Sequence, residues 1–410
     1  MLVCKGAVEE TLAISAFIRD GEKLVPLDNG KRRELMAMTR EYNEDGFRVI
    51  ALSTREFPPG ATKTHYDMSD EQQLVLRGFL AFLDPPKETA GPAIAALRDH
   101  GVGIKILTGD NPVVTRKVCC DVGLSIGTPV LGRDIENLDD AKLCDLVERT
   151  TVFAKVSPLQ KACIIKMLQA NGHTVGFLGD GINDAAALRD ADVGVSVDTA
   201  ADIAKESADI ILLEKSLLVL EQGVITGRET FGNIVKYLKM TASSNFGNMF
   251  SVLVASAFLP FLPMMPLHLM VLDLLYHLSQ LAIPWDRMDK DYLQQPRKWD
   301  ASDIARFMVW IGPISSIFDI TTYCLMWFVF GANSPAQQSL FQSVWFIESL
   351  LSQTLIVHMI RTHKIPFIQS TASPPVLLVT AAVMAIGIFF PFSQLGASVG
   401  MQPLPLSYFA

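Results

Sequence analysis

Lys and Arg disappear from the second half of the chain over three long stretches. Neither residue occurs from Met240 to Asp286, from Phe307 to Ile360, or from Ile365 onward, although both are frequent up to Lys239. Apolar stretches of about 20 residues without basic side chains are long enough to cross a bilayer as helices. The sequence therefore predicts a polar N-terminal part followed by a membrane part.

Five membrane spans are expected, and the loops between them set their orientation. Basic residues gather in the loops Arg287–Lys298 and Arg361–Lys364, and the other loops carry none. Because basic loops stay on the cytosolic side, we expect the polar part and these two loops to be cytoplasmic. The lipid bilayer is then the first predicted partner. The expected spans are about 241–262, 267–284, 304–330, 341–360 and 376–395.

Composition excludes two other classes of protein. Half of the residues are apolar and only 19% are charged, which is unlike a disordered chain. The formal net charge of −8 argues against nucleic acid as a partner, because phosphate contacts need clustered cations. The six Cys show no C-x-x-C spacing, which fits a reduced cytosolic setting for the polar part.

Between about residues 76 and 196, apolar runs alternate with amphipathic segments. This rhythm predicts a parallel sheet with helices on both faces, in which ligands bind beyond the carboxyl ends of the strands. Residues 1–75 are more mixed, with an expected helix near 32–42 and a strand at 48–53. The expected strands are 76–83, 103–107, 152–154, 174–178 and 192–196, and the expected helices are 89–100, 112–122, 159–171 and 185–190.

The segment Gly179-Asp180-Gly181-Ile182-Asn183-Asp184 follows one of these strands. Its two carboxylates, interleaved with glycines, suit a hard-oxygen site for Mg²⁺ beside a phosphate. The glycines allow backbone to approach a ligand closely. The alternative is an ordinary acidic turn between a strand and a helix.

Two further strand ends carry groups that suit a phosphate. Thr108-Gly109-Asp110 offers a hydroxyl and a backbone N–H; the alternative is an ordinary loop in which Asp110 or Asn111 caps the next helix. Lys161 lies in the first turn of a helix, where the dipole disfavours a cation, and so suggests an anionic ligand. A solvated surface Lys is the alternative. The coincidence of these signals at strand ends favours the phosphate interpretation.

The predicted spans also contain polar and ionisable residues. Asn245 and Asn248 share one face of the first span, and Asp273 and His277 share one face of the second. Such groups are costly in a membrane and commonly mark an ion path. Hydrogen bonding between helices is the alternative for the Asn residues. Asp319 and Glu348 are further candidates in the third and fourth spans.

The sequence resembles the P-type ATPases, ion pumps that pass through a phosphorylated Asp, over essentially all 410 residues. The motifs are LVCKGA (2–7), GFRVIALS (46–53), LDPPKE (83–88), ILTGDN (106–111), KVSPLQK (155–161) and GDGINDAAAL (179–188). The phrases SSNFGNMFSVLVASAF (243–258), LSQLAIPWDRMDK (278–290) and LLSQTLIVHMIRT (350–362) are similar to the bacterial magnesium-importing subgroup.

The resemblance implies a fold and a domain order. Residues 1–75 would be the C-terminal part of an α+β nucleotide-binding domain. Residues 76–228 would form a Rossmann-like α/β phosphorylation domain of the haloacid-dehalogenase type that lacks its first strand. Residues 229–410 would form an α-helical transmembrane bundle in the bacterial inner membrane.

The resemblance also implies roles for single residues, with ATP and Mg²⁺ as cofactors and Mg²⁺ as the transported ion. In the polar part these are Lys5 near the adenine, Arg48 near the phosphates, Thr108, Gly109 and Asp110 at the phosphoryl group, Lys161 neutralising it, Asp180 binding Mg²⁺, and Asn183 and Asp184 supporting that site. In the membrane, Asn248, Asp273 and His277 would be ligands of the transported ion.

Two departures from the family pattern qualify these expectations. The phosphorylated motif Asp-Lys-Thr-Gly-Thr does not occur, so we expect a C-terminal fragment of a pump that is inactive alone. The subgroup usually has Asn and then Asp where this chain has Asp273 and His277, and His is an uncommon ligand for Mg²⁺. A pump for another cation such as Ca²⁺, or a non-catalytic truncated membrane protein, stays as the alternative.

Overall fold

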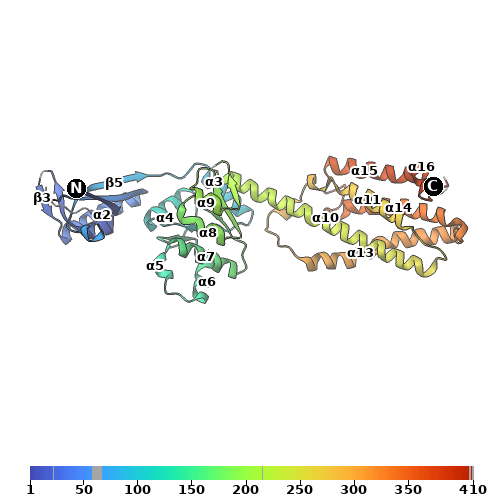
Figure 1. The fold of residues 1–410 in the computed structure, drawn as a ribbon, viewed down its shortest axis with the longest axis horizontal. Helices are drawn as coiled ribbons and strands as arrows, with labels where there is room; N and C mark the ends of the chain where they lie inside the picture. The colour runs from blue at the N-terminus through green and yellow to red at the C-terminus, as the bar shows by residue number, and fades with distance from the viewer. Residues whose placement is uncertain (22, 58–66, 215, 406–407, 409–410) are drawn as a thin grey trace. The chain divides into compact units, whose positions relative to one another are not determined.

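The computed structural model describes residues 1–21, 23–57, 67–214, 216–405 and 408. It divides into two compact units, Met1–Gln222 and Gly223–Ala410 (Figure 1). The first unit mixes helices and strands and the second is helical, in keeping with the change in composition along the chain.

A five-stranded mixed sheet begins unit 1, with strand order β1-β4-β5-β2-β3. Helices α1 (Val8–Ile14) and α2 (Asn29–Glu44) pack against it, and Asp28 caps α2 by accepting the N–H of Lys31. Strand β5 pairs with β4 as far as Leu83, so this sheet extends beyond residue 75. The strands are β1 (Leu2–Ala7), β2 (Ser15–Asp20), β3 (Lys23–Pro26), β4 (Phe47–Arg55) and β5 (Leu74–Leu83).

Two three-stranded parallel sheets follow in the same unit, with strand orders β7-β8-β6 and β9-β10-β11. The predicted alternation of parallel strands and helices is therefore found from β6 onward. The strand expected at 76–83 belongs instead to the five-stranded sheet, where β5 pairs antiparallel with β4. Strand β6 covers only Ile106–Leu107 of the predicted 103–107. The other strands are β7 (Val130–Leu131), β8 (Val152–Ala154), β9 (Gly176–Leu178), β10 (Val193–Val197) and β11 (Ile210–Leu212).

Helix α7 (Pro158–Ala170) joins the cores of these two sheets. Ile164 belongs to the cluster around β8 and Ile165 to the cluster around β9 and β10, and both are fully buried. Leu107 and Val175 contact both clusters. The remaining helices are α3 (Ala90–Asp99), α4 (Pro112–Asp121), α5 (Gly132–Ile135), α6 (Asp140–Arg149), η2 (Ile182–Asp184), α8 (Ala185–Asp190) and α9 (Asp202–Ser207).

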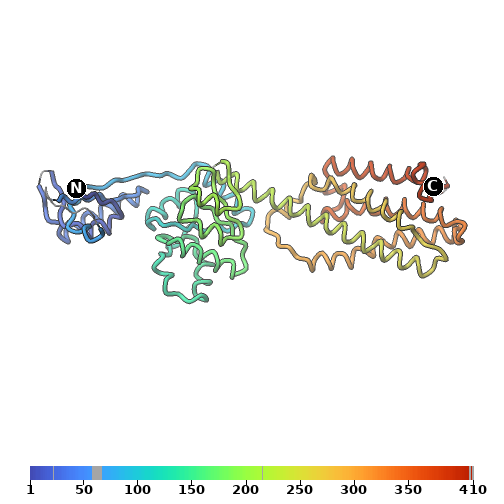
Figure 2. The backbone as a smooth tube through the Cα atoms, in the orientation of Figure 1, coloured from blue at the N-terminus to red at the C-terminus, as the bar shows by residue number. Residues whose placement is uncertain are grey.

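Unit 2 consists of long helices that run alongside one another (Figure 2). Among the described residues, four stretches are long and apolar enough to cross a membrane: Pro266–Trp285, Ala301–Val329, Pro335–Ile360 and Pro374–Phe392. The first predicted span, 241–262, is not among them, because Ser and Asn side chains lower the hydropathy of α10 there; it stays a prediction. The helices are α10 (Leu217–Phe258), α11 (Pro266–Gln280), α13 (Ala301–Cys324), α14 (Gln338–Ile360) and α15 (Pro374–Phe389).

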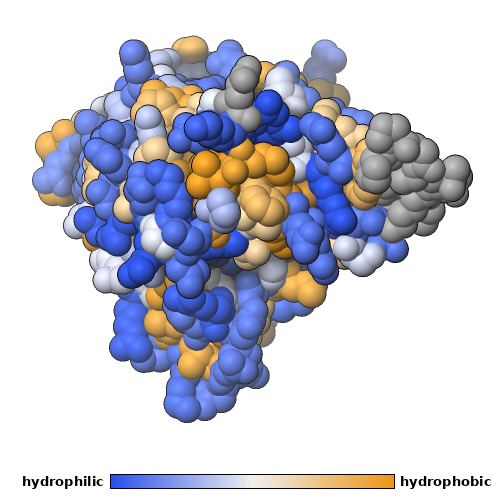
Figure 3. Space-filling model, turned by 90° about the vertical axis from the view of Figure 1, so that its left-hand side faces the viewer, coloured by the Kyte–Doolittle hydropathy of each residue, from blue (hydrophilic) through white to orange (hydrophobic). Residues whose placement is uncertain are grey.

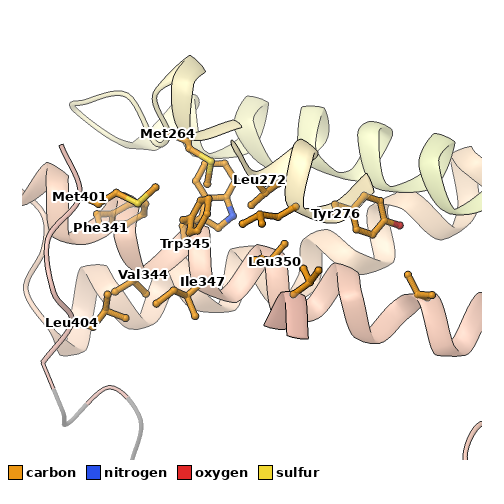
Figure 4. Close-up of a cluster of buried hydrophobic side chains, with 14 of the residues drawn as sticks. Met264, Leu272, Tyr276, Phe341, Val344, Trp345, Ile347, Leu350, Met401 and Leu404 are labelled. Atoms are coloured by element: carbon orange, nitrogen blue, oxygen red, sulfur yellow. The ribbon is translucent and has the colours of Figure 1, made fainter. Parts of the chain in front are cut away.

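The interior of unit 2 is filled by large side chains from several helices. Trp345 and Phe341 of α14 belong to one buried cluster with Leu272 and Tyr276 of α11, and Met401 lies beside Phe341 at one end (Figure 4). Large apolar side chains are also exposed on the outer surface of this unit, for example Leu253, Trp310 and Phe328. The face of the chain in Figure 3 is instead mostly hydrophilic, with a hydrophobic patch among polar residues. Apolar residues on both the inside and the outside are expected of a membrane bundle.

A buried ion cluster lies where α11 and α14 end. The side chain of Asp286 is completely buried, and its Oδ2 accepts hydrogen bonds from Lys236 Nζ and Arg361 Nε, each 2.9 Å long. Burial by itself raises the pKa of the Asp286 carboxyl, but the hydrogen bonds and charges of Arg361 and Lys236 outweigh burial and hold the pKa below its ordinary value.

We expect the stabilisation from Asp286 to disappear in acid. A folded-state pKa below the unfolded one stabilises the fold above about pH 4, and this contribution is lost as the pH falls through the lowered pKa. The melting temperature of the purified chain should therefore exceed that of an Asp286→Asn variant by a constant margin from pH 7 to 5, and the margin should shrink toward pH 3. A margin that does not depend on pH would contradict this reasoning.

Candidate functional site

The loops after β6 and β8 are bonded to each other. The N–H of Val156 donates to the carbonyl of Thr108 over 3.1 Å, and the N–H of Lys155 donates to the carbonyl of Asp110 over 3.1 Å. The Oγ1 of Thr108 accepts the N–H of Asp110 at 3.1 Å. The predicted Thr108–Asp110 segment is thus held against the start of the segment that carries Lys161.

The backbone between β8 and α7 is strained at Lys155, which has φ +51°. This left-handed conformation is unusual for a residue with a side chain, and such residues gather at functional sites. Ser157 then begins α7 with a capping box, in which its hydroxyl accepts the N–H of Gln160 and the Gln160 side chain accepts the N–H of Ser157. Lys161 follows in the first turn of the helix.

Lys161 is paired with Asp184 across the site. Its Nζ lies 2.7 Å from Asp184 Oδ1, and the two side chains are only 12% and 13% exposed. The other oxygen of Asp184 accepts the N–H of Gly181 at 3.1 Å. Gly179 packs so tightly here that a Cβ would lie 2.6 Å from the Cβ of Asp184. Both oxygens of Asp184 thus serve to hold Lys161 and the loop after β9.

Asp180 and Asn183 are exposed at the end of β9, and the Asp180 carbonyl accepts the N–H of Ala201. Contacts therefore run from the 108–110 loop through residues 155–157 and the Lys161–Asp184 pair to the 179–181 loop. No group of three or more His, Cys, Asp or Glu suited to a metal occurs among the described residues. Mg²⁺ is compatible with this, because it keeps several waters and often takes only one or two carboxylates.

Lys5 and Arg48 lie on neighbouring strands of the five-stranded sheet. Lys5 of β1 is opposite Leu52 of β4 in the register, so Lys5 and Arg48 share one face, about 13 Å apart along the strands. Both are exposed, and Arg48 forms an ion pair with Asp110. The predicted nucleotide residues thus occupy one face of this sheet.

In unit 2, Asn248 belongs to a polar network between α10 and α14. Gln353 donates from its Nε2 to Asn248 Oδ1 and, over 2.8 Å, to Ser349 Oγ, and it accepts the hydroxyl of Ser244 at 2.9 Å. Ser244, Ser349 and Gln353 are buried, and a cavity of about 10 Å³, the size of one water, lies beside Gln353. Asn245, by contrast, is exposed.

Asp273 and His277 are half-buried on one face of α11, one turn apart. The His277 ring lies 6.4 Å from that of Tyr237 on α10. These two predicted ligands therefore share one face of α11, whereas Asn248 of α10 is hydrogen-bonded to Gln353 of α14.

A second acidic pair lies deeper in the bundle. Asp319 of α13 accepts the Ser251 hydroxyl and the Trp345 indole N–H, each at 2.6 Å. Glu348 lies beside it, and the buried Oε2 of Glu348 has no hydrogen-bond partner among the described residues. Asp319 of α13 thus connects α10 and α14 through hydrogen bonds.

Comparisons with known proteins agree with this arrangement. The family described as haloacid dehalogenase-like hydrolase matches residues 8–192, and the family described as cation transporting ATPase, C-terminus, matches residues 261–410. The chain is 62% identical over 408 residues to the magnesium-transporting ATPase, P-type 1, of Salmonella typhimurium strain LT2, and 57% identical to that of Escherichia coli K12. Each of these matches covers all of this chain but only 45% of the length of the relative. The chain belongs to the P-type ATPase family.

Membership in the P-type ATPases confirms the predicted fold class, a haloacid-dehalogenase-like α/β part with transmembrane helices, and a multi-pass membrane protein. A calcium-transporting ATPase of Bacillus subtilis is also similar, at 27% identity over 400 residues. The individual roles predicted for the site residues stay predictions.

Several residues of this P-type ATPase site could not be singled out from the sequence. Gln353 and Ser349 are spaced as one helix face, which is a signal for bonding between helices, but no local feature of the sequence indicates Asn248 as the partner of Gln353. The left-handed backbone of Lys155 leaves no mark in composition. Lys236 and Arg361 gave no signal beyond their positive charge.

The Lys161–Asp184 pair allows a stability prediction for unit 1. A Lys161→Met variant leaves a buried carboxylate without its cation, and we expect it to lose about 3 kcal/mol of unfolding free energy. Adding Asp184→Asn should recover most of this loss, because an amide oxygen can still accept the Gly181 N–H. Urea denaturation followed by pulse proteolysis measures the effect.

The matched control is Lys166→Met on the same helix. Lys166 pairs with Asp190 at 3.0 Å, but its side chain is 59% exposed, so the loss should stay within about 0.5 kcal/mol. Equal losses for the Lys161 and Lys166 variants would contradict the importance of the buried pair.

Proposed function

We propose that this chain is the C-terminal part of an ATP-driven Mg²⁺ importer that works through an aspartyl phosphate. The observation that carries the proposal is the identity of 57–62% along the whole chain with proteins named for magnesium transport, against 27% for one named for calcium transport. The acceptor Asp would lie in the part of such a pump that these 410 residues do not cover.

The strand-end loops of unit 1 would serve phosphoryl transfer. Thr108 Oγ1 accepts the Asp110 N–H, which leaves its hydroxyl hydrogen to donate to a phosphoryl oxygen. Lys161, held by Asp184, would place a positive charge beside the same oxygens. Lys5 and Arg48 would bind the nucleotide.

The donors at the end of β9 suit Mg²⁺. Asp180 is exposed and would be the principal ligand, supported by Asn183, because both oxygens of Asp184 are already engaged. When bound, Mg²⁺ offsets the negative charge of the phosphoryl oxygens.

The exposed edges of strands β6 and β9 are evidence for the proposal that a further strand pairs with them in the phosphorylation domain. Within the described residues each is an edge strand of its own parallel sheet, and Leu107 and Val175 contact both cores. Parallel strands of α/β domains are normally covered on all sides, yet Leu178 of β9 is 40% exposed. A strand between β6 and β9 would carry the acceptor Asp to the loops of Thr108 and Asp180.

The membrane unit would carry the ion in the bacterial inner membrane, with unit 1 in the cytoplasm. Asn248, Asp273 and His277 would be its ligands, and Asp273 supplies the carboxylate that a divalent cation requires. Asn248 is already oriented by Gln353.

To test the proposal, we would join the N-terminal part of a relative to this chain and express it in a host that lacks Mg²⁺ transport. Growth in low Mg²⁺ is the expected result. A joined protein that is expressed normally but does not restore growth would refute it, and ATP turnover stimulated by Ca²⁺ instead of Mg²⁺ would identify a calcium pump.

A further inference from the structure

One face of α10 is covered by the segment 284–293, which we name the docking loop. Arg228 donates to the carbonyl of Leu293 over 2.7 Å, and Lys236 donates to the carbonyl of Arg287 over 3.1 Å. These positions are eight residues apart and so lie on the same face of the helix. Asn233, between them, donates to the carbonyl of Asp286 over 3.1 Å.

Gly232 lies in the middle of the same face. A Cβ there would clash with the Cε of Met288 and would lie 3.0 Å from the Cε1 of Tyr292. The docking loop therefore rests directly on the backbone of α10 at this position.

The carboxylate of Asp286 extends this contact to a third and a fourth segment. It binds Lys236 of α10 and Arg361 at the end of α14, and its Oδ1 accepts the N–H of Ser373, which precedes α15. The guanidinium of Arg361 also donates to the carbonyls of Ser370 and Thr371. One buried carboxylate thus connects α10, the docking loop, α14 and the 361–373 loop.

The desolvation of such a cluster costs so much free energy that stability alone does not explain it. Three charged side chains that are 0–7% exposed give up their hydration, and apolar side chains of similar size would hold the same elements at least as well. Charged groups with fixed geometry are better suited to setting the register between elements. The register concerned is that of α10 against α11, because the docking loop continues from α11.

We propose that Asp286 is a positioning residue that locks the docking loop onto α10 and thereby sets the height and rotation at which α10 and α11 present their polar side chains to each other. Asn248 follows Lys236 by twelve residues and Asp273 precedes Asp286 by thirteen, so each lies about 18–20 Å from the cluster along its segment. The consequence for ion affinity rests on the proposed function, whereas the locking of the loop does not.

Hydrogen exchange of the purified 410-residue chain in lipid nanodiscs tests the locking. Asp286→Asn and Lys236→Gln should each speed exchange of amides in the docking loop about tenfold or more. Lys236→Arg, which keeps the charge, should retain the protection. Asp291→Asn is the matched control: Asp291 lies in the same loop, but its side chain is 75% exposed and pairs with Lys364 at the surface. Unchanged exchange in both the Asp286 and Lys236 variants would overturn the proposal.

Arg361→Lys keeps the charge but loses the donors to Ser370 and Thr371. This milder variant keeps the proposal testable if the other variants do not fold. It should speed exchange in the 365–373 segment and leave the docking loop protected. Equal loss of protection throughout unit 2 would show general destabilisation and would overturn a positioning role.

The effect on the ion is measured in the joined pump. Lys236→Gln should raise the Mg²⁺ concentration for half-maximal uptake about tenfold and leave that for ATP unchanged, because a small misplacement of ligands weakens ion binding. Faster exchange without this shift would overturn the positioning role. If the unsubstituted joined pump took up no Mg²⁺, the proposed function would be refuted. The exchange experiments would still test whether Asp286 locks the docking loop onto α10.

Discussion

Replacing Asp180 by Ala in the joined pump is expected to abolish formation of the phosphoenzyme. Asp180 is the exposed carboxylate at the end of β9, beside the Lys161–Asp184 pair, and both oxygens of Asp184 are occupied. No other carboxylate of this loop is therefore able to take over a Mg²⁺ ligand role without releasing Lys161. Loss of one strong electrostatic contact in a site of this kind costs on the order of 100-fold in rate or more. Labelling with radioactive ATP measures the phosphoenzyme.

The matched control for this prediction is Asp202→Ala in the same unit. The side chain of Asp202 is 92% exposed and pairs with Lys205 of its own helix, so labelling should be normal. Normal labelling of the Asp180 variant would show that Mg²⁺ is held elsewhere.

Replacing Asp273 by Ala is expected to abolish Mg²⁺ uptake by the joined pump and to spare nucleotide binding. Asp273 is half-buried in the middle of α11, and its partner His277 is a poor ligand for Mg²⁺. Without the carboxylate the predicted ligand set has no negative charge to offset a divalent cation, so the cost of removing the ion from water is not compensated. Uptake of Mg²⁺ by intact cells and binding of an ATP analogue to isolated membranes measure the two effects.

Asp303→Ala serves as the control for Asp273. Asp303 belongs to unit 2 as well, but its side chain is 53% exposed and pairs with Lys239, so uptake should persist. Undiminished uptake in the Asp273 variant would contradict this prediction, and Asp319 and Glu348, the other acidic pair of the bundle, would then be the next candidate ligands.

Local signals in the sequence were sufficient for much of the fold. Helix α7 was expected at 159–171 and covers Pro158–Ala170, because Ser157 caps it and Gly172, at φ +88°, ends it. Strand β8 was expected at 152–154 and is found there. These boundaries are decided by neighbouring residues, so they can be predicted without knowing the tertiary structure.

Pairings between distant residues could not be predicted in the same way. Gln353 and Asn248 are 105 positions apart, and Asp286 is 50 positions from Lys236 and 75 from Arg361. Strand β6 is shorter than expected, and the side chain of Lys105, which precedes it, donates to three carbonyls at the end of α6. Each of these features depends on which elements meet, and composition does not determine that.

In the part of the chain that the structure describes, no strand pairs with the outer edges of β6 and β9, which has a practical consequence for handling the protein. A strand with unpaired backbone groups recruits extended chain from other molecules. Purified without a segment to cover them, these edges should promote self-association that increases with concentration. Co-expression with a polypeptide that supplies the covering strand should then improve the yield of monodisperse material.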